Sequence, residues 1–298
     1  MQQSLITALR SVELGVADVA ADEKFYTGAW GLTVAARAGD TVYLRATGAD
    51  HHVLSLTPRP KTEVLAVTLR ARNADALATI ASQIGANGGK LESGPAPATD
   101  PAGGSAIYFR DPQGRRFCVV TGDKQHGDVQ DAPDRAERLA HVVLNSTDVD
   151  AVSKFLVGAL GFTVSDRTGH MTFLRCGVGD HHNIAFARAP AHTLNHIAFN
   201  MPSLEAVMLG AGRVRDAGHA IEWGVGRHGP GHNVFAYFVT PGGVVVEYTG
   251  EVEQVDDSYK TGGPDDWKWP PGRIDHWGIS PPPSVRLKEA QTRIVFAE

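Results

Sequence analysis

The sequence predicts an α+β protein in which four βαβββ modules form two tandem domains. The first observation behind this prediction is an internal repeat. The segment FYTGAWGLTVAAR from Phe25 aligns with FLVGALGFTVSDR from Phe155, and the histidine pairs that end at His52 and His182 align at the same shift of 130 residues. Because self-similarity at a fixed shift marks repeated structural units, the halves of the 298-residue chain are expected to be copies of one domain.

The second observation is the order of periodic segments within each half. In the second half, an apolar strand precedes a segment of helical period whose N-cap is Thr147 or Asp148, and three alternating segments follow. The same order recurs with a helix from Ser203 to about Ala217. Strands are expected at 139–145, 162–167, 170–176, 183–189, 194–201, 220–226, 233–239 and 244–250.

A change in composition separates the expected domains. The segment 124–138 is polar, rich in turn-forming residues and without apolar period, which is typical of a linker. The first domain is therefore expected at 8–123 and the second at 139–251. The remaining tail, 252–298, is rich in proline and tryptophan and is expected to pack on the domains.

Composition excludes several classes of function. The formal net charge is −5 and no block of lysine and arginine occurs, so neither nucleic acid nor an anionic membrane is an expected partner. The first residues lack the pattern of a signal peptide, and no run of about 18 apolar residues occurs, so we expect a cytoplasmic protein.

Three polar side chains in apolar strands of the second half indicate a metal site. Side chains alternate along a strand, so His141, His196 and Glu247 can each point from one face of their strand into a shared concavity. Two histidines and one carboxylate form the facial triad that leaves open positions on Fe(II) for substrate and O₂. Taken singly, each residue could instead be a satisfied core histidine or a paired carboxylate.

The repeat provides an internal control for this interpretation. We align His141, His196 and Glu247 with non-ligand residues of the first half, namely Ser11, Val67 and Val119. If the fold itself required polar groups at these positions, the first copy should have them too. A single metal site in the second copy explains why all three positions differ together.

At this point the sequence resembles a known family, the two-domain type I extradiol ring-cleavage dioxygenases of the vicinal-oxygen-chelate superfamily. The most specific block is GRHGPGHNVFAYFVTPGGVVVEYTGE at 226–251. The resemblance implies two glyoxalase/bleomycin-resistance-like domains and a homo-oligomer. It also implies Fe(II), with Mn(II) as the alternative, held only by the second domain through His141, His196 and Glu247.

The resemblance further implies roles for residues around the metal. His182 matches the family's acid/base histidine, whose ordinary pKa of about 6.5 suits proton transfer at neutral pH. His228 and Tyr237 match its substrate-contacting histidine and tyrosine. The chain departs from some members at Val143, where they have Asn, and at Gly231, where they have Asp.

Other polar residues near these motifs have two readings. Arg227, His232 and Asn233 share the glycine-rich loop with His228 and either contact substrate or are solvated loop residues. Aromatic residues of the tail either cover the pocket or serve packing alone, and they are Trp267, Trp269, His276 and Trp277.

The implied activity is extradiol cleavage of a catecholic aromatic substrate with O₂ to a muconic-semialdehyde-type product. Two alternatives stay open. The chain could be another metal-dependent enzyme of the superfamily, such as a glyoxalase-like isomerase or a 4-hydroxyphenylpyruvate-type dioxygenase. It could also be a metal-free protein that binds a planar aromatic ligand, which would leave the three candidate ligands without a role.

Overall fold

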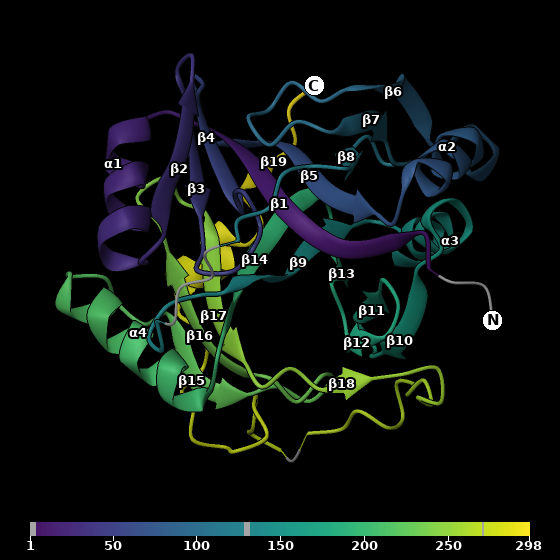
Figure 1. Ribbon diagram of the computed structural model, residues 1–298. Coiled ribbons are helices and arrows are strands. Elements are labelled where there is room, and N and C mark those ends of the chain that lie inside the picture. Colours follow the sequence, from purple (N-terminus) through teal and green to yellow (C-terminus); the bar gives the residue numbers. More distant parts are fainter. Residues whose placement is uncertain (1–3, 128–131, 270) are drawn as a thin grey trace.

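The protein consists of four βαβββ modules, as the repeat predicts, and the elements lie in two stacked halves (Figure 1). The structure is a computed structural model that describes residues 4–127, 132–269 and 271–298. Residues 128–131 of the expected linker lie outside the described residues, and the exact domain boundaries stay predictions.

The modules have the following elements. The first comprises β1 (Ile6–Val16), α1 (Val19–Lys24), a π-helical turn (Phe25–Ala29), β2 (Thr33–Ala38), β3 (Thr41–Arg45) and β4 (Leu54–Pro58). The second comprises β5 (Glu63–Ala71), α2 (Ala74–Gln83), a 3₁₀ turn (Gly85–Asn87), β6 (Lys90–Pro97), β7 (Ser105–Arg110) and β8 (Arg116–Thr121). The third comprises β9 (Arg138–Ser146), α3 (Val149–Leu160), β10 (Thr163–Arg167), β11 (Met171–Arg175), the short β12 (Gly179–Asp180) and β13 (Ile184–Arg188). The fourth comprises β14 (Thr193–Met201), α4 (Leu204–Asp216), β15 (Trp223–Arg227), β16 (Val234–Val239) and β17 (Val245–Gly250).

The helices of the second domain begin where the sequence predicts. The Asp148 side chain accepts a hydrogen bond from Ala151 N at the start of α3, and the Ser203 side chain accepts one from Ala206 N at the start of α4. Each cap satisfies a backbone N–H that the helix itself leaves without a partner. Between the two expected caps of α3, the structure selects Asp148.

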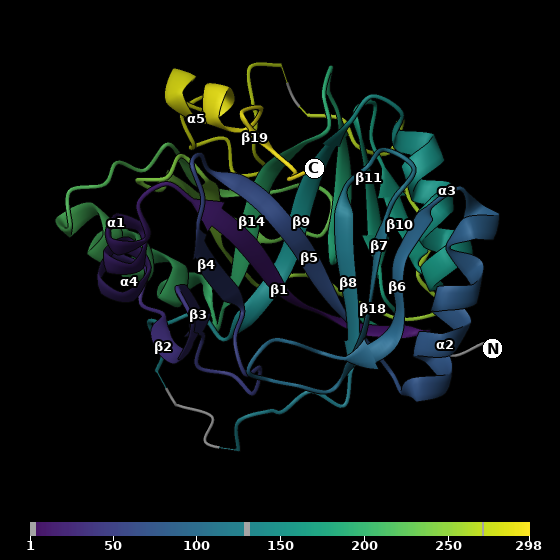
Figure 2. The same ribbon diagram turned by 90° about the horizontal axis from the view of Figure 1, so that it is seen from above.

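In each domain the two modules join through their first strands. The strand order is β2-β3-β4-β1-β5-β8-β7-β6 in the first domain and β10-β11-β13-β9-β14-β17-β16-β15 in the second. In the second domain β9 pairs antiparallel with β14, and β14 pairs parallel with β17. Helix α1 lies beside α4 and helix α2 beside α3, so the modules of different domains also pack in pairs (Figure 2).

The pairing register corrects the alignment of the two domains by one residue at two positions. His196 pairs with Val143, whereas the matching Glu13 of the first domain pairs with Ala66. Glu247 pairs with Ala198, and the matching pair in the first domain joins Thr68 to Cys118. The counterparts of the three candidate ligands are therefore Ser11, Ala66 and Cys118 rather than Ser11, Val67 and Val119. A slip of one residue turns a side chain to the opposite face, and Val67 and Val119 belong to the core that faces the helices.

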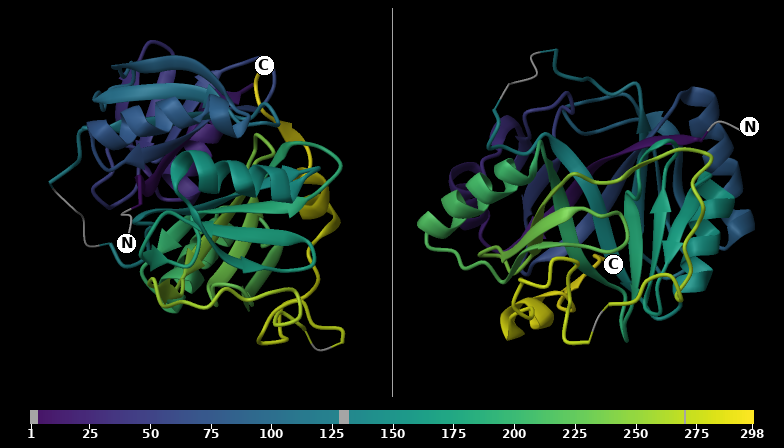
Figure 3. Two further views of the ribbon diagram at one scale, coloured as in Figure 1. Left: turned by 90° about the vertical axis from the view of Figure 1, so that its right-hand side faces the viewer. Right: turned by 90° about the horizontal axis from the view of Figure 1, so that it is seen from below.

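The tail connects the second domain to the first. It contains β18 (Gln254–Val255), which pairs with β12, helix α5 (Val285–Ala290) and β19 (Ile294–Val295), which pairs with the start of β14. Ala297 N then donates to the carbonyl oxygen of Val64 in β5. Figure 3 shows the tail passing over the outside of the second domain before its end returns to the first. Within the described residues, no helix has the length and apolar character needed to cross a membrane.

Trp30 lies at the junction of the domains. Its ring stacks on that of Tyr248 in β17 at a centroid distance of 3.7 Å and an interplanar angle of 7°. The rings of Phe199 and Phe238 contact it edge-on. Trp30 is fully buried, so residues of both domains share one continuous core.

Candidate metal centre and substrate pocket

Three neighbouring strands bring the candidate ligands together. His141 lies on β9, His196 on β14 and Glu247 on β17, and all three side chains are buried. The Nε2 atoms of the two histidines lie 3.3 Å apart. Glu247 Oε2 lies 3.2 Å from His141 Nε2 and 3.0 Å from His196 Nε2. Three residues that are far apart in the sequence thus place their potential metal-binding atoms in a small triangle.

This triangle fits a divalent metal ion. Ligand bonds of about 2.1 Å at right angles place neighbouring ligand atoms about 3 Å apart, close to the three distances observed. Burial alone would raise the pKa of Glu247, but its charge interaction and hydrogen bond with His141, supported by His196, hold that pKa well below the ordinary value. Glu247 is therefore an anion facing two imidazoles, which is the charge arrangement a cation needs. Among the described residues, this is the one group of three or more His, Cys, Asp or Glu side chains with such geometry.

A hydrogen bond from the adjacent residue orients His196. Its Nδ1 lies 2.9 Å from Asn195 Oδ1, and since an amide oxygen only accepts, Nδ1 carries the proton and Nε2 is left for a metal. Asn195 reaches the same side as His196 because the pairing register skips it, which makes it the extra residue of a β-bulge. Gln291, directly after α5, donates from Nε2 to the same Asn195 oxygen at 3.0 Å.

His182 lies beside the triad, in the turn between β12 and β13. Its ring centroid is 4.4 Å from that of His141, and it lines the cavity, whereas the preceding His181 does not. Only one histidine of the pair therefore lines the cavity. Burial lowers the pKa of His182 well below its ordinary value, and His141 and His181 lower it further. The imidazole is therefore neutral at neutral pH, rather than half-protonated as its ordinary pKa suggested.

His228 and Tyr237 form a second polar group at the cavity. His228 Nε2 lies 2.9 Å from the Tyr237 hydroxyl and 3.7 Å from Glu247 Oε1. Burial lowers the pKa of His228 to about 4, although Glu247 acts in the opposite direction. Burial and the charge of Glu247 raise the pKa of Tyr237 well above its ordinary value. The pair thus presents a neutral imidazole and a protonated phenol.

The glycine-rich loop separates into residues that face the site and residues that do not. Asn233 is buried, lines the cavity and donates from Nδ2 to Thr249 Oγ1 at 2.7 Å and toward Glu247 Oε1 at 3.4 Å. Arg227 instead pairs with Glu251, and neither Arg227 nor His232 belongs to the cavity lining. Asn233 is therefore neither a solvated loop residue nor only a substrate contact, because it holds the candidate carboxylate ligand.

The absence of a side chain at Gly231 makes room for the His182 ring. A Cβ atom at this position would lie 3.1 Å from His182 Cε1, and the backbone has a φ of 79°, which L residues rarely adopt. The aspartate that some family members have here would crowd the histidine. The departure at Gly231 thus follows from the packing of this chain.

A cavity of about 480 Å³ lies over the triad. Its lining is largely aromatic and apolar, and within the described chain it includes no lysine or arginine. Four lining residues come from the tail, namely Trp267, Trp269, Ile274 and Gln291. The tail therefore covers the pocket as well as packing on the domains, while His276 and Trp277 lie outside the lining. His170 also lines the cavity.

Sequence reasoning missed Asn195 and Gln291. Strict alternation would place Asn195 on the face opposite His196, and a bulge leaves no recognisable pattern in the sequence. Gln291 lies in a tail without periodicity. The one available signal was the asparagine itself, because a polar side chain directly before a candidate ligand can orient it.

Comparisons with known proteins agree with this geometry. Residues 138–248 match the model of the Glyoxalase/Bleomycin resistance protein/Dioxygenase superfamily, and residues 11–120 match that of a Glyoxalase-like domain. Metapyrocatechase 2 of Cupriavidus necator is 29% identical over 265 residues, which are 81% of this chain and 80% of that protein. The manganese-dependent 2,3-dihydroxybiphenyl 1,2-dioxygenase of Geobacillus genomosp. 3 is 25% identical over 241 residues, 73% of this chain and 76% of that protein.

A solved structure extends the similarity over nearly the whole chain. The Mn(II)-bound glyoxalase from Novosphingobium aromaticivorans superposes with a TM-score of 0.87 and 36% identity, covering 93% of this chain and 92% of that one. The similarity therefore covers both halves of the chain. The chain belongs to the Glyoxalase/Bleomycin resistance protein/Dioxygenase superfamily, with one glyoxalase-like domain in each half.

Proposed function

We propose that the protein is an extradiol dioxygenase that cleaves the ring of a catecholic substrate beside its two hydroxyl groups, using both atoms of O₂. The observation that carries the proposal is the buried triangle of His141, His196 and Glu247, which faces a cavity lined by His182, His228 and Tyr237. Three protein ligands on one side leave the opposite side for substrate and O₂. The relatives named metapyrocatechase and dihydroxybiphenyl dioxygenase support this reaction.

The metal in this proposal is Fe(II), with Mn(II) as the alternative. Two imidazoles and a carboxylate suit either ion, and two of the similar proteins are named for manganese. When bound, the metal supplies the redox chemistry by which a catechol and O₂ can react. The protein supplies position, shelter from water and proton transfer.

His182 takes the role of the base. A neutral imidazole over the triad can accept the proton of a substrate hydroxyl as that oxygen approaches the metal side of the cavity. Tyr237 keeps its proton and can donate a hydrogen bond to a substrate oxygen that becomes negative. His228, held by the Tyr237 hydroxyl, adds a second polar contact on the same side.

The glyoxalase-like alternative predicts a different site and a different assay result. Isomerases of that type commonly use more protein ligands, whereas the described residues offer three at this position. The deciding experiment is to load the protein with Fe(II) without air and then add O₂ with monocyclic and bicyclic catechols. We expect O₂ uptake and a yellow ring-opened product with a catechol, and neither with a 2-oxo acid. Isomerase turnover without O₂ uptake would contradict the proposal.

The pocket favours an uncharged, hydrophobic catechol. At about 30 Å³ for each water-sized group, the cavity holds roughly sixteen non-hydrogen atoms, twice the eight of catechol. Phe173, Trp223, Trp267 and Trp269 surround that space, and no cationic side chain lines it within the described residues. A carboxylate buried there would have no lysine or arginine to neutralise its charge, which is costly.

We therefore expect an aryl- or alkyl-substituted catechol to have a kcat/KM at least about tenfold above that of a catechol bearing a carboxylate. Steady-state O₂ uptake with matched substrate pairs measures the ratio. Introducing a cation by Ile274→Lys should narrow the ratio or reverse it. Equal kcat/KM values for charged and neutral substrates would contradict this assignment of the pocket.

The bulge residue Asn195 provides a test of how the metal is held. Asn195→Leu keeps the size of the side chain but removes the acceptor that orients His196, so metal binding should weaken by about 10- to 100-fold. A competition titration of Mn(II) against a chelator measures this change. Asn200→Leu is the control, because Asn200 lies on the same strand but contacts Glu137. Equal losses in both variants would show a general effect on β14.

A further inference from the structure

We infer that Asp166 and His181, which have no assigned role, hold His182 in the tautomer that presents an unprotonated Nε2 to the pocket. The inference rests on the proposed function, in which His182 is the base, and it names two positioning residues behind that base. It concerns where the proton of a neutral imidazole lies.

The chain of contacts starts at a buried carboxylate. Asp166 Oδ2 lies 2.8 Å from His181 Nε2, and both residues are fully buried. The tail adds two donors to the same carboxylate, since the Tyr259 hydroxyl donates to Oδ2 at 3.1 Å and Gly262 N donates to Oδ1 at 2.6 Å. A carboxylate that receives these bonds acts as an acceptor, so His181 Nε2 carries a proton.

The contact between His181 and His182 links the tautomer of His181 to that of the proposed base. His181 Nδ1 lies 3.0 Å from His182 Nδ1, so one of these two atoms donates and the other accepts. A neutral His181 with its proton on Nε2 has only a lone pair at Nδ1. His182 must then donate from Nδ1, which leaves Nε2 as the free base of the imidazole.

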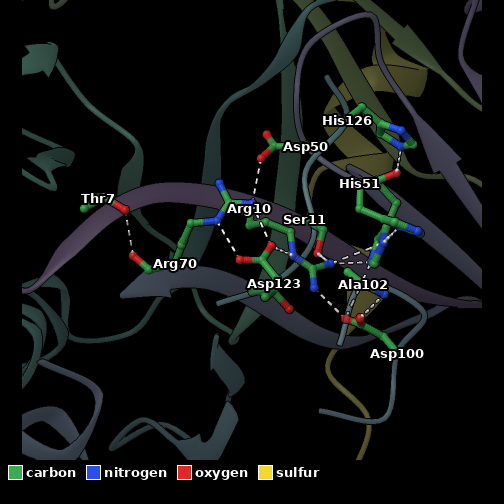
Figure 4. Close-up of polar contacts among 12 residues, drawn as sticks. Thr7, Arg10, Ser11, Asp50, His51, Arg70, Asp100, Ala102, Asp123 and His126 are labelled. Atoms are coloured by element: carbon green, nitrogen blue, oxygen red, sulfur yellow. Dashed lines mark hydrogen bonds and ion pairs between the residues drawn. The ribbon is translucent and has the colours of Figure 1, made fainter. Parts of the chain in front are cut away.

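The first domain contains the same histidine pair in a different setting. His51 Nδ1 also lies 3.0 Å from His52 Nδ1. Arg10 Nη1 lies against the His52 ring, closer to Nε2 than to Nδ1, which is 3.4 Å away. Because a guanidinium group can only donate, the closer contact favours an unprotonated Nε2 and an Nδ1 that donates to His51. Figure 4 shows Arg10 between His51, Asp100 and Asp123, and its guanidinium group binds both carboxylates.

The differences between the two copies separate the scaffold from the chemistry. The residue that matches Arg10 at the shift of 130 is Ala140, so the position over His182 is open to substrate. The residue that matches Asp166 is Ala36, and His51 stacks on His126 instead of binding a carboxylate. Of the two copies, only the second therefore has a buried carboxylate, Asp166, behind its histidine pair.

This arrangement supports a defined proton transfer. The O–H bond of the substrate breaks, the proton moves to His182 Nε2, and the electron pair stays on the substrate oxygen. The imidazolium that results keeps its Nδ1–H bonded to His181, and the negative charge of Asp166 lies at the end of the same chain. In serine proteases a buried aspartate holds the catalytic imidazole in its tautomer in the same way, with one imidazole fewer.

The direct test is the tautomer of His182 in protein loaded with diamagnetic Zn(II). Two-dimensional ¹H–¹⁵N spectra of ring-labelled histidine distinguish a protonated from an unprotonated ring nitrogen, and His182→Ala assigns the signals. We expect Nδ1 of His182 to carry the proton and Nε2 to be bare. A proton on His182 Nε2, with His181 donating from Nδ1, overturns the inference.

Kinetics of matched variants test the consequence. His181→Phe removes the acceptor, and we expect kcat to fall by about 10²-fold or more with unchanged metal content and little change in KM. Asp166→Asn keeps the shape but weakens the anchor and should lower kcat less. His181→Asn restores an acceptor near His182 Nδ1 and should recover part of the loss. His51→Phe, the same change in the first domain, should leave kcat unchanged.

The outcomes distinguish this inference from the proposed function. If wild-type protein consumes no O₂ with any catechol while the spectra show the expected tautomer, the proposed function fails and the positioning role of His181 stands. If wild-type protein is active and His181→Phe and Asp166→Asn both retain full kcat, the positioning role fails. A loss of metal in His181→Phe would also overturn it, since the effect would then lie in the metal site.

Discussion

Glu247→Ala is expected to lose tightly bound metal and to lower turnover by well over the roughly 100-fold that the loss of an outer hydrogen bond costs. Glu247 supplies one of three donor atoms and the only negative charge of the triangle, and its side chain is fully buried between His141 and His196. Two neutral imidazoles alone neither complete the triad nor neutralise a divalent ion. Elemental analysis after anaerobic loading and gel filtration measures the metal, and O₂ uptake measures turnover.

Three variants make this expectation specific. Glu247→Gln keeps the volume but removes the charge and should also lose most of the metal. His182→Ala should keep the metal and turn over slowly, because His182 contacts the triad without being part of it. Cys118→Ala changes the counterpart of Glu247 in the first domain and should affect neither quantity. The assignment fails if Glu247→Ala retains both metal and normal turnover.

The modules and the meeting of the three candidate ligands could be predicted because they depend on regular features. Alternation of side chains along strands and the order strand, helix, three strands are local patterns, and the duplication allowed each pattern to be checked against its copy. His141, His196 and Glu247 each interrupt an apolar strand on one face. Regular geometry then brings the three side chains to one point.

Features that depend on irregular backbone could not be predicted. The contact of Asn195 with His196 is one such feature, because a bulge shifts the register by one residue without a characteristic sequence. The matches of His196 to Val67 and of Glu247 to Val119 were errors of another kind. Constant shifts of 130 and 129 residues lead to Ala66 and Cys118, and the pairing register agrees with them. The correction leaves the internal control intact, since Ser11 and Ala66 cannot replace imidazole ligands.

The long-range contacts of the tail also could not be predicted from the sequence. Tyr259 and Gly262 bind Asp166, and Gln291 binds Asn195, so the tail supports both the proposed base and a candidate metal ligand from behind. None of these residues belongs to a periodic segment. Proline and tryptophan content indicated packing of the tail, but the partners follow only from the three-dimensional arrangement.

The first domain, which lacks the candidate ligands, contacts the strand that bears Glu247 through Trp30. Trp30→Ala should lower the free energy of unfolding by about 3–5 kcal/mol, because a fully buried indole would be replaced by a cavity at the domain junction. Urea denaturation followed by circular dichroism measures the loss. Trp30→Phe fills part of the space and should cost less.

The position of Trp30 predicts an effect on the metal as well. Its ring stacks on Tyr248, the residue directly after Glu247, and the Tyr248 hydroxyl donates to the Trp30 carbonyl oxygen. Neighbouring residues of a strand point to opposite faces, so Trp30 packs against the back of β17 where Glu247 projects from the front. Trp30→Ala should therefore also weaken Mn(II) binding, measured under conditions in which the variant is still folded. The loss of Mn(II) affinity in the double variant Trp30→Ala/Tyr248→Ala should be smaller than the sum of the losses in the single variants. Additive losses would show that the two rings act independently; a shared loss makes the first domain the support that keeps the carboxylate ligand in place.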